Sequence, residues 1–212
     1  MIEINSFVFN SFEVNTFVLH DKTNECVIID AGSYTLQEEK ELIGHIESNE
    51  LKPVALLNTH CHVDHVPGNL FLSQKYGLSP RSHILENDLL FGVVEYAEIF
   101  GLKLKQPPIV KSYLVENENI TFGNSVLSTI LVPGHSPGSI AFYNKHQKFL
   151  IAGDVLFRGS IGRTDLPGGN YNTLIDSIKQ KLFALDNDVI VYPGHGPITT
   201  IGEEKKHNPF LQ

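Results

Sequence analysis

The sequence has few cysteines and no excess of basic side chains. Its two cysteines, Cys26 and Cys61, are too few for a disulfide framework, and this predicts a protein of a reducing compartment. The formal net charge of the 212 residues is -8. This acidity argues against nucleic acid as a partner, because phosphate binding requires a basic surface.

Long apolar runs are also missing. The N-terminal stretch MIEINSFVFNSFEVN lacks the basic region and the apolar core of a secretory signal, and no later run is long enough to span a membrane. We therefore expect a cytoplasmic protein with no membrane partner. No low-complexity tract or linker interrupts the chain, which predicts a single domain over residues 1–212.

Short β-branched and aromatic runs predict strands, and longer stretches with apolar residues at helical spacing predict helices. The expected strands are 2–9, 15–20, 25–32, 54–58, 112–116, 119–123, 125–133, 139–144, 148–154 and 188–196. The expected helices are 36–49, 68–77, 86–101, 171–185 and 200–208. Mixed runs of this kind favour two packed sheets with helices on the outer faces.

The ten histidines divide into two groups. Five lie in turns or on charged helix faces, where a surface position is the simplest interpretation: His20, His45, His83, His146 and His207. The other five follow apolar strands, in loops that contain glycine or proline. Because strand ends meet at one edge of a sheet, where loops commonly build a site, this second group predicts a functional centre.

Three of these histidines and an aspartate are crowded into the segment NTHCHVDHVPGN, residues 58–69. A helix would bring His60 and Asp64 to one face but not His62, and Pro67 after a strand also disfavours a helix. In a loop, His60 and His62 can face one point, and Asp64 with His65 can face another. The segment therefore predicts two cations rather than one.

Single polar residues follow three later strands and complete two ligand sets. The first set is His60, His62 and His135. The second set is Asp64, His65 and His195. Asp154, at the end of the strand KFLIAG, can bridge the two ions. Nitrogen and oxygen ligands without thiolate suit zinc, iron or manganese, and coordination that the protein leaves incomplete is typical of a catalytic site.

The pattern H-x-H-x-D-H, followed by separate His, Asp and His motifs, resembles the metallo-β-lactamase fold superfamily. The resemblance covers nearly the whole chain and matches all seven ligand positions in order. It implies an α/β fold, the αββα sandwich, with two mixed sheets, helices on the outer faces and metals at one edge. Asp30, in IIDAG, matches an early aspartate of the family that supports the metal ligands, although it could simply end a strand.

The loop GDVLFRGSIGRTDLPGG, residues 153–169, narrows the branch of the superfamily. It is similar to the loop after the bridging aspartate in glyoxalase II-like hydrolases, and its G-R-T-D element also resembles persulfide dioxygenases. Arg163 and Asp165 could form an ion pair that braces the loop, or Arg163 could meet a substrate carboxylate. Arg158 is a weaker candidate for substrate contact. The additional C-terminal helical domain of full-length glyoxalase II is not expected here.

This resemblance implies a metal-dependent thioester hydrolase, similar to hydroxyacylglutathione hydrolases, that uses two divalent ions. Zinc is expected first, with iron or manganese as alternatives. A metal-bridging hydroxide would attack an acyl carbonyl, and Asp64 would help to orient it. A thiolate leaves with a pKa of roughly 8.5 and needs little acid assistance, which favours a thioester over an amide. S-lactoylglutathione is the substrate that the resemblance suggests first.

Two alternatives stay open at the level of sequence. The first is a persulfide dioxygenase with one iron held by His60, His135 and Asp154, whose open positions would bind oxygen. The second is a binding module that metal stabilises without catalysis. The metal, the acyl group, the thiol and the oligomeric state are not specified by the sequence.

Overall fold

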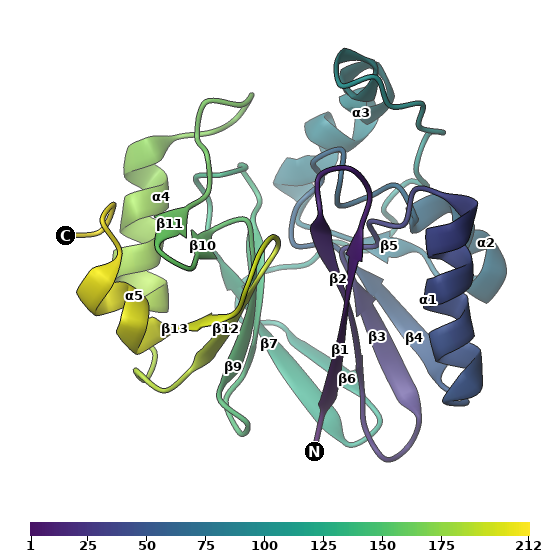
Figure 1. Cartoon of the computed structure of the whole chain (residues 1–212), viewed down its shortest axis with the longest axis horizontal. Coiled ribbons are helices and arrows are strands. Elements are labelled where there is room, and N and C mark those ends of the chain that lie inside the picture. Colours follow the sequence, from purple (N-terminus) through teal and green to yellow (C-terminus); the bar gives the residue numbers. More distant parts are fainter. The chain divides into compact units, whose positions relative to one another are not determined.

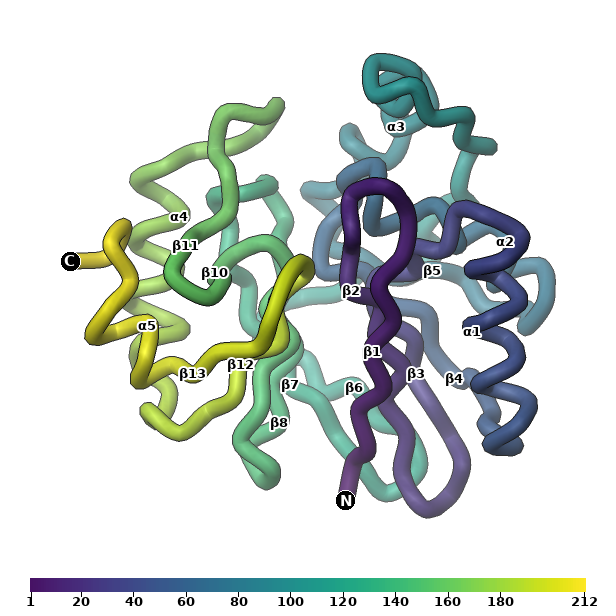
Figure 2. The backbone as a smooth tube through the Cα atoms, in the orientation of Figure 1, coloured from purple at the N-terminus to yellow at the C-terminus, as the bar shows by residue number.

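The computed structural model describes all 212 residues, Met1 to Gln212. Figures 1 and 2 draw the whole chain in the same orientation, coloured along the sequence. The chain divides into two units. Unit 1 comprises Met1–Tyr113 with Thr121–Ser125, and unit 2 comprises Leu114–Ile120 with Val126–Gln212. The single domain over residues 1–212 stays a prediction.

Unit 1 contains a five-stranded mixed sheet in the order β1-β2-β3-β4-β5. Its strands are β1 (Glu3–Phe9), β2 (Val14–His20), β3 (Glu25–Ile29), β4 (Lys52–Leu57) and β5 (Pro80–Arg81). The first three strands are antiparallel neighbours, and β4 runs parallel to both β3 and β5. The carboxyl ends of β3 and β4 therefore lie side by side, which brings Asp30 close to the histidine segment.

The helices of unit 1 are α1 (Leu36–Ser48), α2 (Asn69–Tyr76), the 3-10 turn η1 (Ile84–Glu86) and α3 (Asn87–Ile99). A reciprocal capping box between Thr35 and Glu38 begins α1, and Gly77 in the left-handed region ends α2. The apolar side of α1 and α2 packs with β2, β3 and β4 in one buried core. The helices predicted over 36–49, 68–77 and 86–101 are confirmed as α1, α2 and α3.

A second mixed sheet has the order β13-β12-β9-β8-β7-β6. Its strands are β6 (Asn119–Phe122), β7 (Ser125–Leu131), β8 (Ile140–Asn144), β9 (Phe149–Gly153), β12 (Ile190–Pro193) and β13 (Thr199–Thr200). The pair β9 and β12 is parallel, whereas β7, β8 and β9 are antiparallel neighbours. Consequently the carboxyl ends of β7, β9 and β12 point the same way along the sheet, and each is followed by a polar residue of interest.

The helices of unit 2 are α4 (Tyr171–Ser177), a π-helical turn η2 (Ile178–Leu182) that continues it, and α5 (Ile201–His207). They pack against the second sheet through Leu174, Ile178 and Ile201, all fully buried. A small hairpin of β10 (Leu156–Phe157) and β11 (Ser160–Ile161) follows Asp154.

The strand predicted over 112–116 is wrong. Only Leu114 forms an isolated bridge there, and the residues on either side of it are not fully buried. An apolar sequence of five residues is too short for periodicity to distinguish a strand from an irregular segment that buries one leucine. None of the helices is long and apolar enough to cross a membrane.

Candidate metal centre

The histidine segment of unit 1 is a buried loop that leaves the sheet after β4. His60 and His65 are fully buried, and the rings of both are tightly packed, with centroids 4.1 Å apart. The His60 and His62 rings meet edge to face at 4.7 Å. Burial disfavours the charged imidazolium, and like charges this close would repel, so both effects favour neutral rings over three adjacent imidazolium ions. Neutral, buried imidazoles that converge with a carboxylate form a donor set that fits a divalent cation.

Asp30 determines which nitrogen of His60 carries the hydrogen. Its carboxylate accepts the backbone N–H of Thr59 at 2.7 Å and the Thr59 hydroxyl at 2.7 Å. The hydroxyl has a single hydrogen, which it donates to this carboxylate. Thr59 Oγ1 can therefore only accept a hydrogen bond from His60 Nδ1, which lies 3.0 Å away. His60 Nδ1 therefore holds the ring hydrogen, and Nε2 presents a lone pair.

The same carboxylate acts on His65. His65 Nδ1 lies 3.0 Å from Asp30 Oδ2, and both side chains are fully buried. This contact favours hydrogen on Nδ1 and a lone pair on Nε2, which lies 3.6 Å from Asp64 Oδ2. Asp30 has a φ of 53°, a left-handed conformation that aspartate tolerates better than most residues. Asp30 thus contacts both Thr59 and His65, and its support of metal ligands stays a prediction.

Side-chain amides hold the loop backbone in its turn. The Asn58 amide donates to the carbonyl oxygen of His65 at 3.0 Å, and Asn69 donates to Asn58 Oδ1 at 2.9 Å. Gly68 closes the loop, and its N–H donates to the Ala31 carbonyl at 2.8 Å. A Cβ at Gly68 would come within 3.0 Å of that carbonyl oxygen, so the close approach requires glycine.

Two further residues brace the loop and have no obvious signal in the sequence. Glu86, which is fully buried, accepts the backbone N–H of Cys61 at 2.8 Å. Asn10 donates to the Asp64 carbonyl at 3.0 Å. Burial, with Glu86 as the next cause, raises the pKa of the Cys61 thiol well above its ordinary value, so Cys61 is a neutral, buried side chain between two histidines.

Unit 2 gathers its three predicted ligands around one carboxylate oxygen. Asp154 Oδ2 lies 3.7 Å from His135 Nε2 and 3.4 Å from His195 Nε2. His135 is almost fully buried, whereas about a quarter of the His195 side chain is exposed. Each residue follows a different strand of the sheet, β7, β9 or β12, as the sequence predicted. A carboxylate oxygen between two imidazoles would be a suitable donor for a divalent cation.

The G-R-T-D loop positions His135 through its backbone. His135 Nδ1 donates to the carbonyl oxygen of Arg163 at 2.7 Å, which leaves the lone pair on Nε2. The Arg163 guanidinium forms a two-point ion pair with Asp165, at 2.8 and 2.7 Å. This pair is one of the two interpretations that the sequence allowed. The Arg163 side chain lowers the pKa of Asp165 to about 2.

Gly162 allows the same loop to approach the ligands. A Cβ there would collide with the Asp154 carbonyl oxygen and come within 3.2 Å of His135 Cβ.

Arg158 is exposed at an open cleft that Ile198 and Glu203 also line. Among the histidines expected on the surface, His146 and His207 are exposed, while His20, His45 and His83 are partly buried.

The fold and both ligand clusters place the chain in a known class. The family model of the metallo-beta-lactamase superfamily matches residues 10–195, and the chain belongs to this superfamily of metal-dependent enzymes. The predicted metallo-β-lactamase fold, with two mixed sheets and helices, is confirmed.

Particular relatives are similar over almost their full length. The hydroxyacylglutathione hydrolase GloC of Haemophilus influenzae is 38% identical over 208 residues, which cover 95% of this chain and 94% of the relative. The crystal structure of BLEG-1, described as a B3 metallo-beta-lactamase, has a TM-score of 0.91 at 33% identity and covers 99% of this chain and 100% of its own. The di-iron-bound structure of TTHA1623 has a TM-score of 0.89 at 35% identity, with coverages of 98% and 100%.

Proposed function

We propose that the protein is a metal-dependent hydrolase of a small acyl thioester, with S-lactoylglutathione as the first candidate substrate. The observation that carries the proposal is the set of buried imidazoles whose lone pairs are directed by Asp30 and by the Arg163 carbonyl. The similarity to a relative named hydroxyacylglutathione hydrolase, at 38% identity over 95% of the chain, supports the choice of a thioester.

In this proposal the seven motif residues hold two divalent ions. His60, His62 and His135 serve one ion, Asp64, His65 and His195 serve the other, and Asp154 serves both. Zinc, iron and manganese all suit this set of nitrogen and oxygen donors, and a di-iron form of the similar TTHA1623 keeps iron in consideration. When bound, such ions supply a water whose pKa falls from about 15.7 to about 7 and polarise a carbonyl.

The protein residues then provide orientation and proton acceptance. The Asp64 side chain is 11% exposed, and its Oδ2 lies 3.6 Å from His65 Nε2. In the proposal this oxygen accepts a hydrogen bond from a nucleophilic water. The leaving thiolate has a pKa of roughly 8.5 and needs no acid from the protein. In this proposal the motif imidazoles act as lone-pair donors to the ions rather than as acids, which fits a leaving group that needs no acid.

The two arginines receive different roles. Arg163 is engaged with Asp165, so we assign it to bracing the loop that holds His135. Arg158 is exposed, and it stays a candidate for contact with a charged part of the substrate.

The test combines metal analysis with a substrate panel. Purified protein is assayed for metal content and then for cleavage of S-lactoylglutathione, other acyl thioesters and a β-lactam, before and after chelation and metal restoration. His62→Ala is compared with His146→Ala, which removes an exposed histidine outside the clusters. We expect thioester cleavage that chelation and His62→Ala abolish and that His146→Ala leaves unchanged.

Three results would contradict the proposal. The first is a rate that metal removal does not change, and the second is no cleavage of any thioester by fully metal-loaded protein. The third is one iron per chain together with oxygen uptake on glutathione persulfide, which would identify the dioxygenase instead. Loss of folding on chelation, in a protein that shows no activity on the panel, would identify the non-catalytic module.

A further inference from the structure

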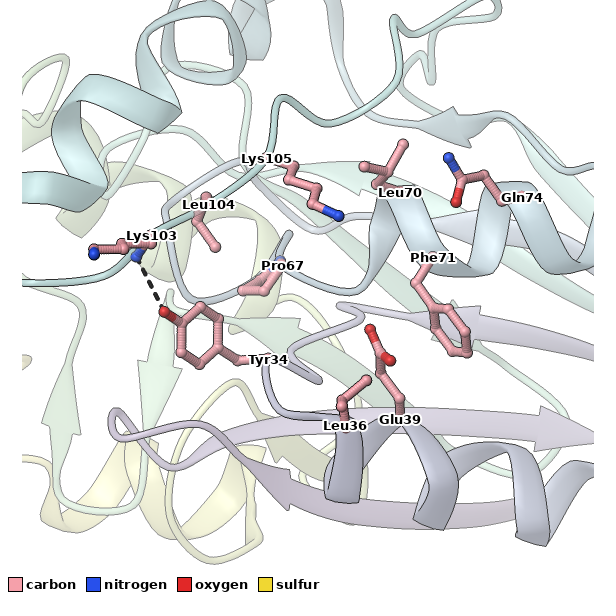
Figure 3. Close-up of a pocket in the computed structure, with 10 residues that line it drawn as sticks. All are labelled: Tyr34, Leu36, Glu39, Pro67, Leu70, Phe71, Gln74, Lys103, Leu104 and Lys105. Carbon is pink, nitrogen blue, oxygen red and sulfur yellow. Dashed lines mark hydrogen bonds between the residues drawn. The ribbon is translucent and has the colours of Figure 1, made fainter.

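A second concave site lies in unit 1, away from the candidate metal ligands. A cavity of about 310 Å³ lies between α1, α2 and the segment 103–105, and Figure 3 shows the side chains that line it. Its apolar lining includes Tyr34, Pro67, Phe71 and Leu104, and none of the seven motif residues lines it. The volume is at the lower end of the range for ligand pockets, about 300–1,000 Å³, which limits an occupant to a small molecule.

Two opposite charges face this cavity without a direct partner. The side chains of Glu39, from α1, and Lys105 extend into it from opposite sides (Figure 3). Neither side chain forms a hydrogen bond or a direct ion pair within the chain. Burial raises the pKa of the Glu39 carboxyl, and the charge of Lys105 opposes that increase. The charges therefore influence each other across the cavity without closing it.

The wall that carries Lys105 is held in place independently of any ligand. The backbone N–H of Lys103 donates to the Tyr34 hydroxyl at 3.0 Å, the dashed line in Figure 3. The Lys103 side chain points away from the cavity in the same view. The charged groups that face the interior are thus one carboxylate and one ammonium, and the other lining side chains are apolar except for Gln74 and the hydroxyl of Tyr34.

We propose that this cavity binds a small zwitterion of the amino-acid class with an apolar side chain. The ligand ammonium meets Glu39, its carboxylate meets Lys105, and its side chain lies against Phe71 and Leu104. An apolar anion would leave the Glu39 carboxylate facing like charge, and an apolar amine would do the same at Lys105, so only a zwitterion satisfies both groups. Both charged side chains are partly solvated, so we expect a Kd of about 1 mM.

The first experiment compares three ligands that share one side chain. L-leucine, 4-methylpentanoate without the ammonium, and 3-methylbutylamine without the carboxylate are titrated to about 10 mM, tenfold above the expected Kd. The readout is the methyl resonances of Leu70 and Leu104, which line the cavity. We expect saturable shifts at these methyl groups with leucine and much weaker shifts with the other two.

The second experiment removes the charges one at a time. Glu39→Gln and Lys105→Met should each weaken leucine binding about three- to tenfold, whereas Glu41→Gln, an exposed residue of the same helix that does not line the cavity, should leave it unchanged. No saturable shift with leucine, equal binding of 4-methylpentanoate, or an unchanged Kd in both charge variants would overturn the proposal. Because the readout is binding, this result is independent of the hydrolase assay.

Discussion

Asp30→Asn is the substitution that probes the candidate metal centre most directly. The asparagine oxygen can still accept the Thr59 N–H, as Asp30 Oδ1 does at 2.7 Å. Its NH2 group then occupies the position of Oδ2 and donates toward both Thr59 Oγ1 and His65 Nδ1. The Thr59 hydroxyl must turn and donate to His60 Nδ1. Both histidines are consequently driven to carry hydrogen on Nε2, the nitrogen that has to bind metal.

The magnitude follows from these contacts. Replacing residues that orient metal-binding histidines typically reduces metal affinity about 10–100-fold, or about 1.4–2.7 kcal/mol. We expect the upper part of this range, because one substitution reverses the tautomers of two imidazoles. The metal-free protein should also lose about 1–3 kcal/mol of its free energy of unfolding, since a buried carboxylate that accepts two hydrogen bonds and contacts His65 loses its charge. Asparagine tolerates the left-handed backbone at this position, so strain adds little.

The assay is a competition titration with a chromophoric chelator, together with thermal unfolding of the metal-free protein. Asp21→Asn is the matched control. Asp21 is a buried aspartate of the same unit. It accepts hydrogen bonds from Thr23, Asn124 and Ser125, and none of these residues belongs to the histidine loop. Asp21→Asn should reduce stability and leave metal affinity unchanged. An unchanged affinity in Asp30→Asn, or an equal loss in both variants, would refute the tautomer argument.

Four further outcomes are expected. Gly162→Ala should destabilise the protein by about 1–3 kcal/mol in chemical denaturation and lower its metal content, because its Cβ collides with the Asp154 backbone; retention of full metal content would contradict this. Gly44→Ala, in the exposed middle of α1 with open space around it, should instead stabilise by about 0.5–1 kcal/mol. Burial raises the pKa of Asp21, but its hydrogen bonds outweigh burial and hold the pKa well below its usual value. The stability that the ionised Asp21 contributes is therefore present above about pH 4 and declines as the pH falls further. An acid titration of Asp21→Asn should lack this decline. Arg163→Met should leave metal content unchanged because the carbonyl rather than the side chain holds His135, and a selective increase in KM would show that the side chain contacts substrate.

Much of the architecture could be predicted because its local signals agree with its packing. Helix α1 begins with a capping box and has Leu42 and Ile46 on one buried side, so periodicity and chain chemistry indicate the same element. The two-residue strands β5, β10, β11 and β13 were missed, since elements this short have no period. The strand predicted around Leu114 was wrong for the opposite reason. Its few apolar residues resembled a strand, but the structure buries only one of them.

The candidate ligands could be recognised because metal chemistry restricts residue type as well as spacing. Histidine and aspartate at the ends of apolar strands have few structural explanations. Four of the candidates lie together in unit 1 and three in unit 2, and their division into two ligand sets stays a prediction. The supporting residues could not be recognised in the same way. Glu86 and Asn10 are ordinary polar residues far from residues 58–69 in the chain, and only the folded backbone brings them to the N–H of Cys61 and the carbonyl of Asp64.

The sequence by itself determined the ligand types, their order and the strands that present them, because these depend on donor chemistry and on local apolar patterns. The tertiary structure decided which nitrogen of His60, His65 and His135 carries the ring hydrogen, because that depends on contacts between distant segments. Asp30 acts on His60 through Thr59, and the Arg163 carbonyl acts on His135. It also decided that Glu39 and Lys105 face one cavity, 66 positions apart in the numbering (105 minus 39).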